Sequence, residues 1–243
     1  MSTSSQVHLY GDYGSQPTRA VYVLLAHYKI PFTFHQVNVG TLDQYKPEYK
    51  KINPNAKVPA MVDKLVDGSE VVLYESHTIM RYIFETRQLP DHLYPKDNHK
   101  LRAKIDEYLD WHHNGLRLGA GGYIFRKYIS PLTGKPAPKE AIVESLALLK
   151  RALKLMDTYW LSNSEYLVGN QLTLADISAA CELNQITASN QAPLIEQFPK
   201  VSKWLKKINE ELPAMKEVND KGLPMLAKYF KKIDKQEQEQ AKL

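Results

Sequence analysis

Residues 8–22 read HLYGDYGSQPTRAVY and decide how the first part of the chain folds. A short apolar segment ends at the glycines, which predicts a strand followed by a turn. Pro17 opens the next segment, and proline fits the first turn of a helix because its missing N–H would be unpaired there. Ser15 therefore lies just before a predicted helix, where free N–H groups and the helix dipole favour an anion. Its hydroxyl either caps this helix or donates a hydrogen bond to a bound thiolate.

The residues around this stretch continue an alternation of strand and helix patterns. Strand patterns lie at 7–10, 32–39, 58–62 and 70–74, and helix patterns lie at 17–28, 43–51 and 76–86. Their order, βαβαββα, predicts an α/β domain over residues 6–87, with a small mixed sheet and helices packed on it. Prolines and aspartates interrupt both patterns at 88–98, which predicts a linker.

The patterns after the linker are helical, which predicts an all-α domain over residues 99–233 and a flexible polar tail over 234–243. The spacing of Thr173 and Asp176 before an apolar run predicts a capping box at a helix start. The glycines within 119–122 predict a kink or break in the first long helix, because each interior glycine costs about 1 kcal/mol relative to alanine.

Composition excludes several classes of function. The net charge of +5 comes from lysines scattered among acidic residues, which indicates a solvated surface and no nucleic-acid site. The one cysteine, Cys181, excludes a disulfide within the chain and lies in an apolar helical pattern, as a small core residue would. No apolar run is long enough to span a membrane. The histidines show no metal-ligand spacing, and the neighbours His112 and His113 project about 100° apart on a helix.

Several motifs in this order resemble the cytosolic glutathione transferases. The turn Ser15-Gln16-Pro17 resembles the theta class, and so does the helix motif Asp106–Trp111. Lys57-Val58-Pro59-Ala60 and Glu75-Ser76 resemble two further family segments. The resemblance covers residues from about 7 to about 208. It implies a thioredoxin-like N-terminal domain that binds glutathione and an all-α C-terminal domain that binds an electrophile.

The resemblance also implies roles for individual residues. Ser15 is expected to donate a hydrogen bond to the glutathione thiolate, and Arg117 is expected to assist it. The theta class commonly has histidine at the position of Gln44, so we expect the glycyl end of glutathione to bind more weakly or differently here. The residues expected to bind glutathione, with Pro59 in a cis peptide, are Gln44, Lys57, Val58, Pro59, Glu75, Ser76 and Asp106.

The implied activity is conjugation of glutathione, a co-substrate, to small electrophiles such as alkyl and aralkyl halides or sulfate esters, or the reduction of hydroperoxides. A non-catalytic binding or assembly module of the same fold stays open as an alternative. A thiol–disulfide oxidoreductase on this scaffold is nearly excluded, since its chemistry needs a cysteine near Ser15. The resemblance implies a homodimer. We expect a cytoplasmic protein, with the peroxisome as an alternative because Ala241-Lys242-Leu243 resembles a C-terminal address.

Overall fold

The computed structural model describes residues 6–240, and its contacts divide the chain into two compact units. The first unit contains the residues up to Pro90 together with Leu212–Gly222, and the second contains Asp91–Glu211 and the residues from Leu223 onward. The linker predicted at 88–98 includes the 3-10 turn Asp91–Leu93, and Leu93 is fully buried. The segment 212–222 groups with the first unit, whereas the sequence predicted one continuous helical domain from 99 to 233.

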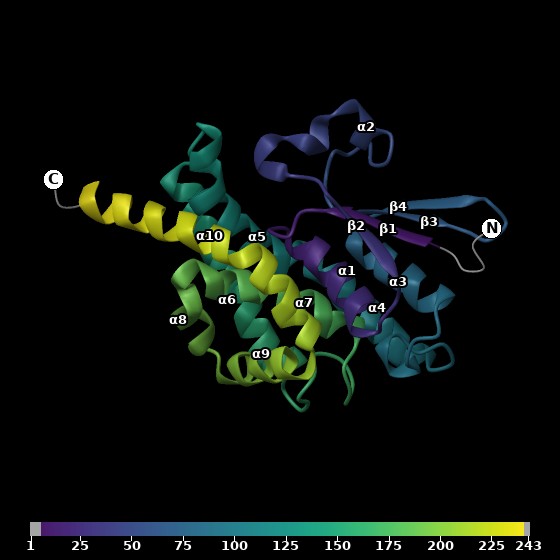
Figure 1. Ribbon diagram of the computed structural model, residues 1–243. Coiled ribbons are helices and arrows are strands. Elements are labelled where there is room, and N and C mark those ends of the chain that lie inside the picture. Colours follow the sequence, from purple (N-terminus) through teal and green to yellow (C-terminus); the bar gives the residue numbers. More distant parts are fainter. Residues whose placement is uncertain (1–5, 241–243) are drawn as a thin grey trace. The chain divides into compact units, whose positions relative to one another are not determined.

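The first unit is built on a four-stranded mixed sheet in the order β2-β1-β3-β4 (Figure 1). Strand β1 pairs parallel with β2 and antiparallel with β3, and β3 pairs antiparallel with β4. The bounds are β1 Gln6–Gly11, β2 Phe32–Gln36, β3 Ala60–Lys64 and β4 Glu70–Tyr74. The predicted βαβαββα order and mixed sheet are confirmed.

Helices cover both faces of this sheet. Helices α1 (Gln16–His27) and α3 (Ser76–Thr86) contact each other and lie on the face to which Val7 and Leu9 point (Figure 1). The short helix α2 (Pro47–Lys50) lies on the opposite face, where Tyr49 packs with Val37 and Ala60. The alternation along β1 therefore places Tyr10 and Leu9 in two separate apolar layers.

The second unit is helical. Its helices are α4 (His99–Asn114), α5 (Leu116–Ile124), α6 (Lys139–Leu155), α7 (Leu174–Ile186), α8 (Ala192–Glu196) and α9 (Pro199–Glu211). Helix α10 (Pro213–Gln240) begins in the first unit and continues into the second. Helix α7 is buried along its whole length, and Cys181 lies in this core as predicted. None of the helices within residues 6–240 has the length and apolar character needed to cross a membrane.

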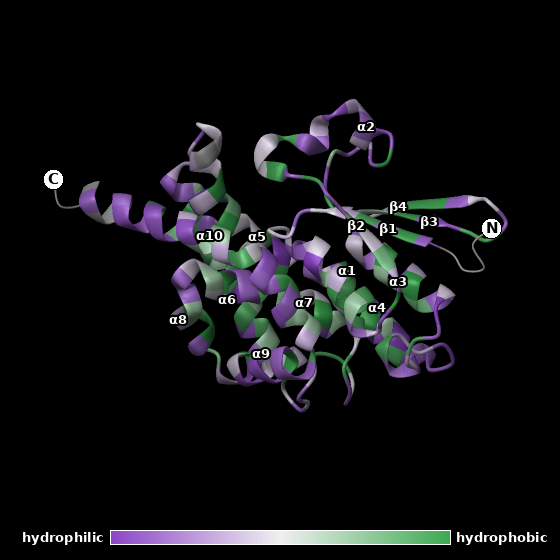
Figure 2. Cartoon of the chain, viewed as in Figure 1, coloured by the Kyte–Doolittle hydropathy of each residue, from purple (hydrophilic) through white to green (hydrophobic). Residues whose placement is uncertain are grey.

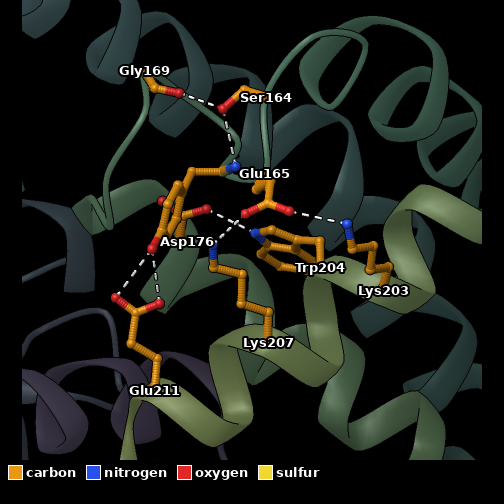
Figure 3. Close-up of polar contacts among 9 residues, drawn as sticks. Ser164, Glu165, Gly169, Asp176, Lys203, Trp204, Lys207 and Glu211 are labelled. Atoms are coloured by element: carbon orange, nitrogen blue, oxygen red, sulfur yellow. Dashed lines mark hydrogen bonds and ion pairs between the residues drawn. The ribbon is translucent and has the colours of Figure 1, made fainter.

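The start of α7 is held by a network of buried hydrogen bonds, of which Figure 3 shows the one from Trp204 Nε1 to Asp176 Oδ1. The predicted capping box is present, and Asp176 Oδ2 accepts from the backbone N–H of Thr173 at 2.9 Å. The Thr173 hydroxyl donates to the same oxygen, also at 2.9 Å. Asp176 Oδ1 accepts from Leu167 N at 2.9 Å and from Trp204 Nε1 at 2.8 Å. Burial raises the pKa of the Asp176 carboxyl to about 6. The residue that the sequence motif identifies, Asp176, therefore also joins α7 to α9 through its hydrogen bond with Trp204.

The predicted kink at the glycine run is wrong. The chain breaks earlier, at Gly115 between α4 and α5, while residues 119–122 lie inside α5. Gly119 is buried against α6, and a Cβ atom there would lie 2.5 Å from Leu149 N. The glycine is therefore needed for the close approach of two helices, and this packing outweighs its low helix propensity.

The predicted flexible tail is also wrong over residues 234–240, where α10 continues as a helix. Residues 235–240 are Lys, Gln and Glu, which are good helix formers, and Lys235 Nζ lies 3.8 Å from Glu239 Oε1 one turn later. In Figure 2 the C-terminal part of α10 is coloured mostly as hydrophilic, as expected of a solvated helix. Residues 241–243, which carry the predicted peroxisomal address, lie outside the described residues.

Candidate functional site

The strand register brings four predicted site segments to one end of the sheet. Tyr10, Ala60 and Tyr74 lie in one row across β1, β3 and β4. The segments that continue from this row carry Ser15 after β1, Pro59 immediately before β3 and Glu75 immediately after β4. The fourth segment, which carries Gln44, follows the end of β2. The first unit therefore holds most of the predicted site in one place.

Ser15 caps helix α1 only loosely. Its backbone is extended, with φ −84° and ψ 123°, and its N–H donates to Asp12 O at 2.9 Å. The Ser15 Oγ accepts from Thr18 N at 3.4 Å, which is long for a hydrogen bond. Within residues 6–240 no acceptor for the proton of this half-buried hydroxyl is found. The hydroxyl can therefore cap the helix and still donate to a ligand.

A buried arginine fixes the turn that holds Ser15. Arg19 is fully buried on α1, and its Nη1 donates to Tyr13 O and Gly14 O, both at 3.1 Å. Arg19 was not among the residues predicted to belong to the site. Its position four residues after Ser15, on the first turn of the helix, is the signal that could have suggested a role.

The Val58–Pro59 peptide is cis, as the resemblance implied. The carbonyl of Lys57 just before it accepts from Tyr49 Oη at 2.5 Å and from Asn53 Nδ2 at 2.7 Å. Burial raises the pKa of Tyr49 to about 12, so its phenol stays a hydrogen-bond donor at neutral pH. Lys57 extends an exposed side chain, and Val58 is half-buried beside the start of β3. Two side chains therefore hold this backbone segment in place.

No side chain within residues 6–240 caps the start of α3. Glu75, at the N-cap position, has φ 75° and an exposed side chain that makes no capping hydrogen bond. A positive φ at a residue other than glycine costs about 1–3 kcal/mol, and such strained residues cluster at active and ligand-binding sites. Ser76 follows as the first helical residue and is 4% exposed. The N–H groups of this helix start therefore form a site suited to a carboxylate.

Gln44 is buried with an unused hydrogen-bond acceptor. Its side chain lies in the 3-10 turn Asp43–Tyr45 and is 7% exposed. Its Oε1 accepts no hydrogen bond from any residue of the described range 6–240. A buried oxygen left without a donor costs about 1–3 kcal/mol, so a donor supplied by a ligand would recover that free energy.

The remaining two predicted residues belong to the second unit, and each has a partner there. Arg117 Nη2 forms an ion pair with Oε1 of the fully buried Glu182. His112 Nε2 lies 3.6 Å from the same oxygen, and burial lowers the pKa of this histidine. The Arg117 side chain is 28% exposed, and its counter-ion Glu182 was not among the residues predicted from the sequence.

Asp106 on α4 is held by a tyrosine of the same unit. Tyr94 Oη lies 2.9 Å from Asp106 Oδ1 and 3.0 Å from Oδ2, so the hydroxyl donates to the carboxylate. The structure thus brings Ser15, Gln44, Val58, Pro59, Glu75 and Ser76 to one end of the sheet, and places Arg117 and Asp106 on helices of the second unit. Within residues 6–240, no group of three or more His, Cys, Asp and Glu residues could hold a metal ion.

Comparisons with known proteins agree with this architecture. The N-terminal domain of glutathione S-transferases matches residues 17–87, and the C-terminal domain matches residues 121–211. The chain is 37% identical over 206 residues to "Glutathione S-transferase T1" of Arabidopsis thaliana, covering 82% of each. A crystal structure of human glutathione transferase theta-2, in complex with glutathione and an unknown ligand, has a TM-score of 0.84 and 31% identity, covering 93% of this chain and 91% of that one.

A second solved structure is equally similar. The human theta-class transferase in complex with the glutathione conjugate of 1-menaphthyl sulfate has a TM-score of 0.84 and 30% identity, again covering 93% of this chain and 91% of that chain. The matches span both units and include relatives more than 30% identical along most of their length. This chain therefore belongs to the glutathione S-transferase family and is similar to its theta-class members.

Proposed function

We propose that this chain binds glutathione at the end of its sheet and activates the thiol through a hydrogen bond from the Ser15 hydroxyl. The observation that carries the proposal is the unused donor of Ser15 at a helix start. A hydroxyl whose proton has no internal acceptor can donate to a sulfur anion, and the positive end of the helix dipole favours the same charge.

The free energy required matches what one hydrogen bond supplies. A free thiol has a pKa of about 8.5, so only a few per cent is ionised at neutral pH. Lowering that pKa by about two units requires about 2.7 kcal/mol of preferential binding to the thiolate. A hydrogen bond to a charged group contributes about 1.5–3 kcal/mol, so the Ser15 bond supplies most of this.

The other groups of glutathione have complementary partners in the first unit. The uncapped start of α3, with Ser76, suits the γ-glutamyl carboxylate, and Glu75 suits the ammonium group beside it. The backbone of Val58 offers its N–H and C=O to the cysteinyl unit, as an added strand would. Gln44 and Lys57 are the residues that we propose to bind the glycyl end of glutathione.

For Arg117 we propose a supporting role at the reacting sulfur or the leaving group. Its charge is balanced by Glu182, but a guanidinium has five N–H donors, and the side chain is 28% exposed. The electrophiles we propose are small alkyl and aralkyl halides, sulfate esters and organic hydroperoxides. The conjugate of 1-menaphthyl sulfate in the similar human enzyme supports an aralkyl sulfate among them.

The experiment compares the wild-type protein with Ser15→Ala, and with Ser69→Ala as a matched serine of the same unit away from the site. Glutathione binding is measured by calorimetry, the bound thiolate by ultraviolet absorbance against pH, and turnover with an alkyl halide and an aralkyl sulfate. We expect Ser15→Ala to raise the pKa of the bound thiol by roughly one to two units and to lower turnover at pH 7 by roughly 10- to 100-fold. Turnover by Ser15→Ala at the wild-type rate would show that the assignment is wrong. Wild-type protein that bound glutathione without any turnover would instead favour the non-catalytic module.

The proposal extends to assembly and compartment. We propose a homodimer in which Asp106 reaches the glutathione bound to the partner subunit, and a cytoplasmic location with the peroxisome as the alternative. Light scattering of the purified chain tests the first part, because a monomeric mass would contradict it. Imaging of the chain with its C-terminus free tests the second.

A further inference from the structure

We propose that Asp12 is a positioning residue that sets the distance between Ser15 and the Gln44 segment, and so aligns the thiol and glycyl ends of glutathione. The inference rests on the proposed function of Ser15. Neither end of the ligand needs to touch Asp12 for this role, because the carboxylate acts through the backbone of two segments.

The two oxygens of the Asp12 carboxylate hold two different segments. Oδ1 accepts from Gly14 N at 2.8 Å, inside the turn that carries Ser15. Oδ2 accepts from Val39 N at 2.9 Å, at the start of the segment that carries Gln44. The Asp12 carbonyl also accepts from Ser15 N at 2.9 Å. A single half-buried residue therefore joins the two segments directly.

The second segment is stiff enough to transmit this link. Val39–Thr41 forms a 3-10 turn whose N-cap residue, Asn38, accepts from Gly40 N at 2.9 Å and from Thr41 N at 3.2 Å. Asp43 N donates to Asn38 O at 3.0 Å, and Asn38 N donates to Asp43 Oδ2 at 3.2 Å. Gln44 follows immediately, and its buried Oε1 has no hydrogen-bond partner among residues 6–240. A shift of Val39 is therefore passed along a closed set of hydrogen bonds to Gln44.

This role requires a carboxylate at position 12. Each of its oxygens accepts from one backbone N–H, and asparagine would present an oxygen to only one of them and an NH2 group to the other. Asp12→Asn therefore breaks one of the two links. Val39→Pro breaks only the link between Asp12 Oδ2 and residue 39, since proline has no N–H. Asn38 before it is extended, with φ −72° and ψ 106°, and is therefore compatible with a following proline.

The decisive experiment compares Val39→Pro with Val39→Ala, which keeps the N–H. Binding of glutathione and of γ-glutamylcysteine, which lacks the glycyl end, is measured by calorimetry, and the pKa of the bound thiol by absorbance. We expect Val39→Pro to lower the affinity for glutathione by roughly 10- to 100-fold. The affinity for γ-glutamylcysteine should change by less than about threefold. Val39→Ala is expected to bind both as the wild type does. Equal weakening of both ligands by Val39→Pro, or no weakening at all, would overturn the inference.

A second set of variants tests Asp12 itself. Asp12→Asn is expected to lower the affinity for glutathione. In the double variant, its loss of binding free energy should not add to that of Gln44→Ala, because both substitutions act on the same end of the ligand. Asp67→Asn is the matched control, since Asp67 Oδ1 accepts from Ser69 N at 2.9 Å in the hairpin between β3 and β4, away from the site. Strictly additive losses from Asp12→Asn and Gln44→Ala would overturn the inference.

The two proposals fail in different ways. If Ser15→Ala changes the pKa of the bound thiol and Val39→Pro leaves glutathione binding unchanged, only the role of Asp12 is wrong. If wild-type protein binds no glutathione, both proposals are wrong.

Discussion

Helices α1 and α7 begin in opposite ways. At the start of α7, the Asp176 carboxylate accepts four hydrogen bonds, and both Thr173 and Asp176 are at most 1% exposed. At the start of α1, the half-buried Ser15 accepts one long hydrogen bond of 3.4 Å from Thr18 N. Both starts carry a polar side chain at the expected capping position, but only the start of α7 has its side chains fully engaged.

The difference separates structural from functional use of a helix start. The hydrogen bonds of Thr173 and Asp176 at the start of α7 are all made within the protein. They therefore stabilise the fold, and these two side chains are not available to bind a ligand. Among the residues that the structure describes, the Ser15 hydroxyl proton at the start of α1 has no acceptor, and the start of α3 has no side-chain cap. Both of these helix starts belong to the unit in which we place glutathione. Three substitutions and one pH titration test whether the starts of α1 and α7 differ in this way.

The largest expected effect on stability is at Asp176. Asparagine can accept two of the four hydrogen bonds and places an NH2 group against the other donors, so we expect Asp176→Asn to lose about 2–4 kcal/mol of unfolding free energy. Urea unfolding measures this loss. The control is Asp220→Asn on α10, where the carboxylate pairs with Lys216 at an exposed position and no measurable loss is expected. A loss at Asp176 no larger than at Asp220 would contradict the structural role.

The pH dependence of stability gives a second test at the same residue. Burial raises the pKa of Asp176 to about 6, above the ordinary value of about 3.9 that applies in the unfolded chain. Between these values the native state binds more protons than the unfolded state, so this group's contribution is largest below about pH 4 and is lost as pH rises through about 6. The free energy of unfolding of the wild type minus that of Asp176→Asn should therefore fall between pH 4 and 6 and level off above about 7. A difference that rises over this interval would contradict the assignment.

The local parts of this comparison were predictable from sequence. The spacing of Thr173 and Asp176 identifies the capping box, and the order of glycines, Ser15 and Pro17 identifies a strand-to-helix turn. Both signals involve residues close in sequence, whose geometry follows from the backbone of one turn. The break near the glycine run was misplaced because Gly119 is required by close packing against α6. The sequence pattern of α5 alone carries no information about this contact.

The parts that depend on distant residues could not be read from the sequence. Trp204 donates to Asp176 across 28 residues, and Glu182 pairs with Arg117 from another helix. Asp12 holds Val39 across 27 residues, although an acidic residue two positions before a glycine is itself a signal for a side-chain turn. Such partners are chosen by tertiary packing, so a sequence pattern indicates the group but leaves its partner open.

Helix α4 provides an intermediate case for the third prediction. Asn98 caps it with one exposed hydrogen bond of 3.1 Å from Leu101 N. Replacing such a cap by alanine typically costs about 1 kcal/mol, so Asn98→Ala should lose less than Asp176→Asn. Urea unfolding of both variants under the same conditions checks the order. Equal losses would show that buried and exposed caps contribute alike in this chain, against the distinction drawn between them.

The smallest effect on stability is expected at Ser15, together with the largest effect on chemistry. Its capping bond is longer than that of Asn98, so Ser15→Ala should lose less than about 1 kcal/mol of unfolding free energy. The same change removes the donor to the thiolate, so turnover should fall while the fold persists. Unfolding and turnover are measured on one preparation, beside Asn98→Ala, for which the opposite pattern is expected: a loss of stability with normal turnover per folded molecule. If Ser15→Ala lost as much stability as Asn98→Ala and kept its turnover, Ser15 would be an ordinary helix cap, and the contrast between the two helix starts would have no functional meaning.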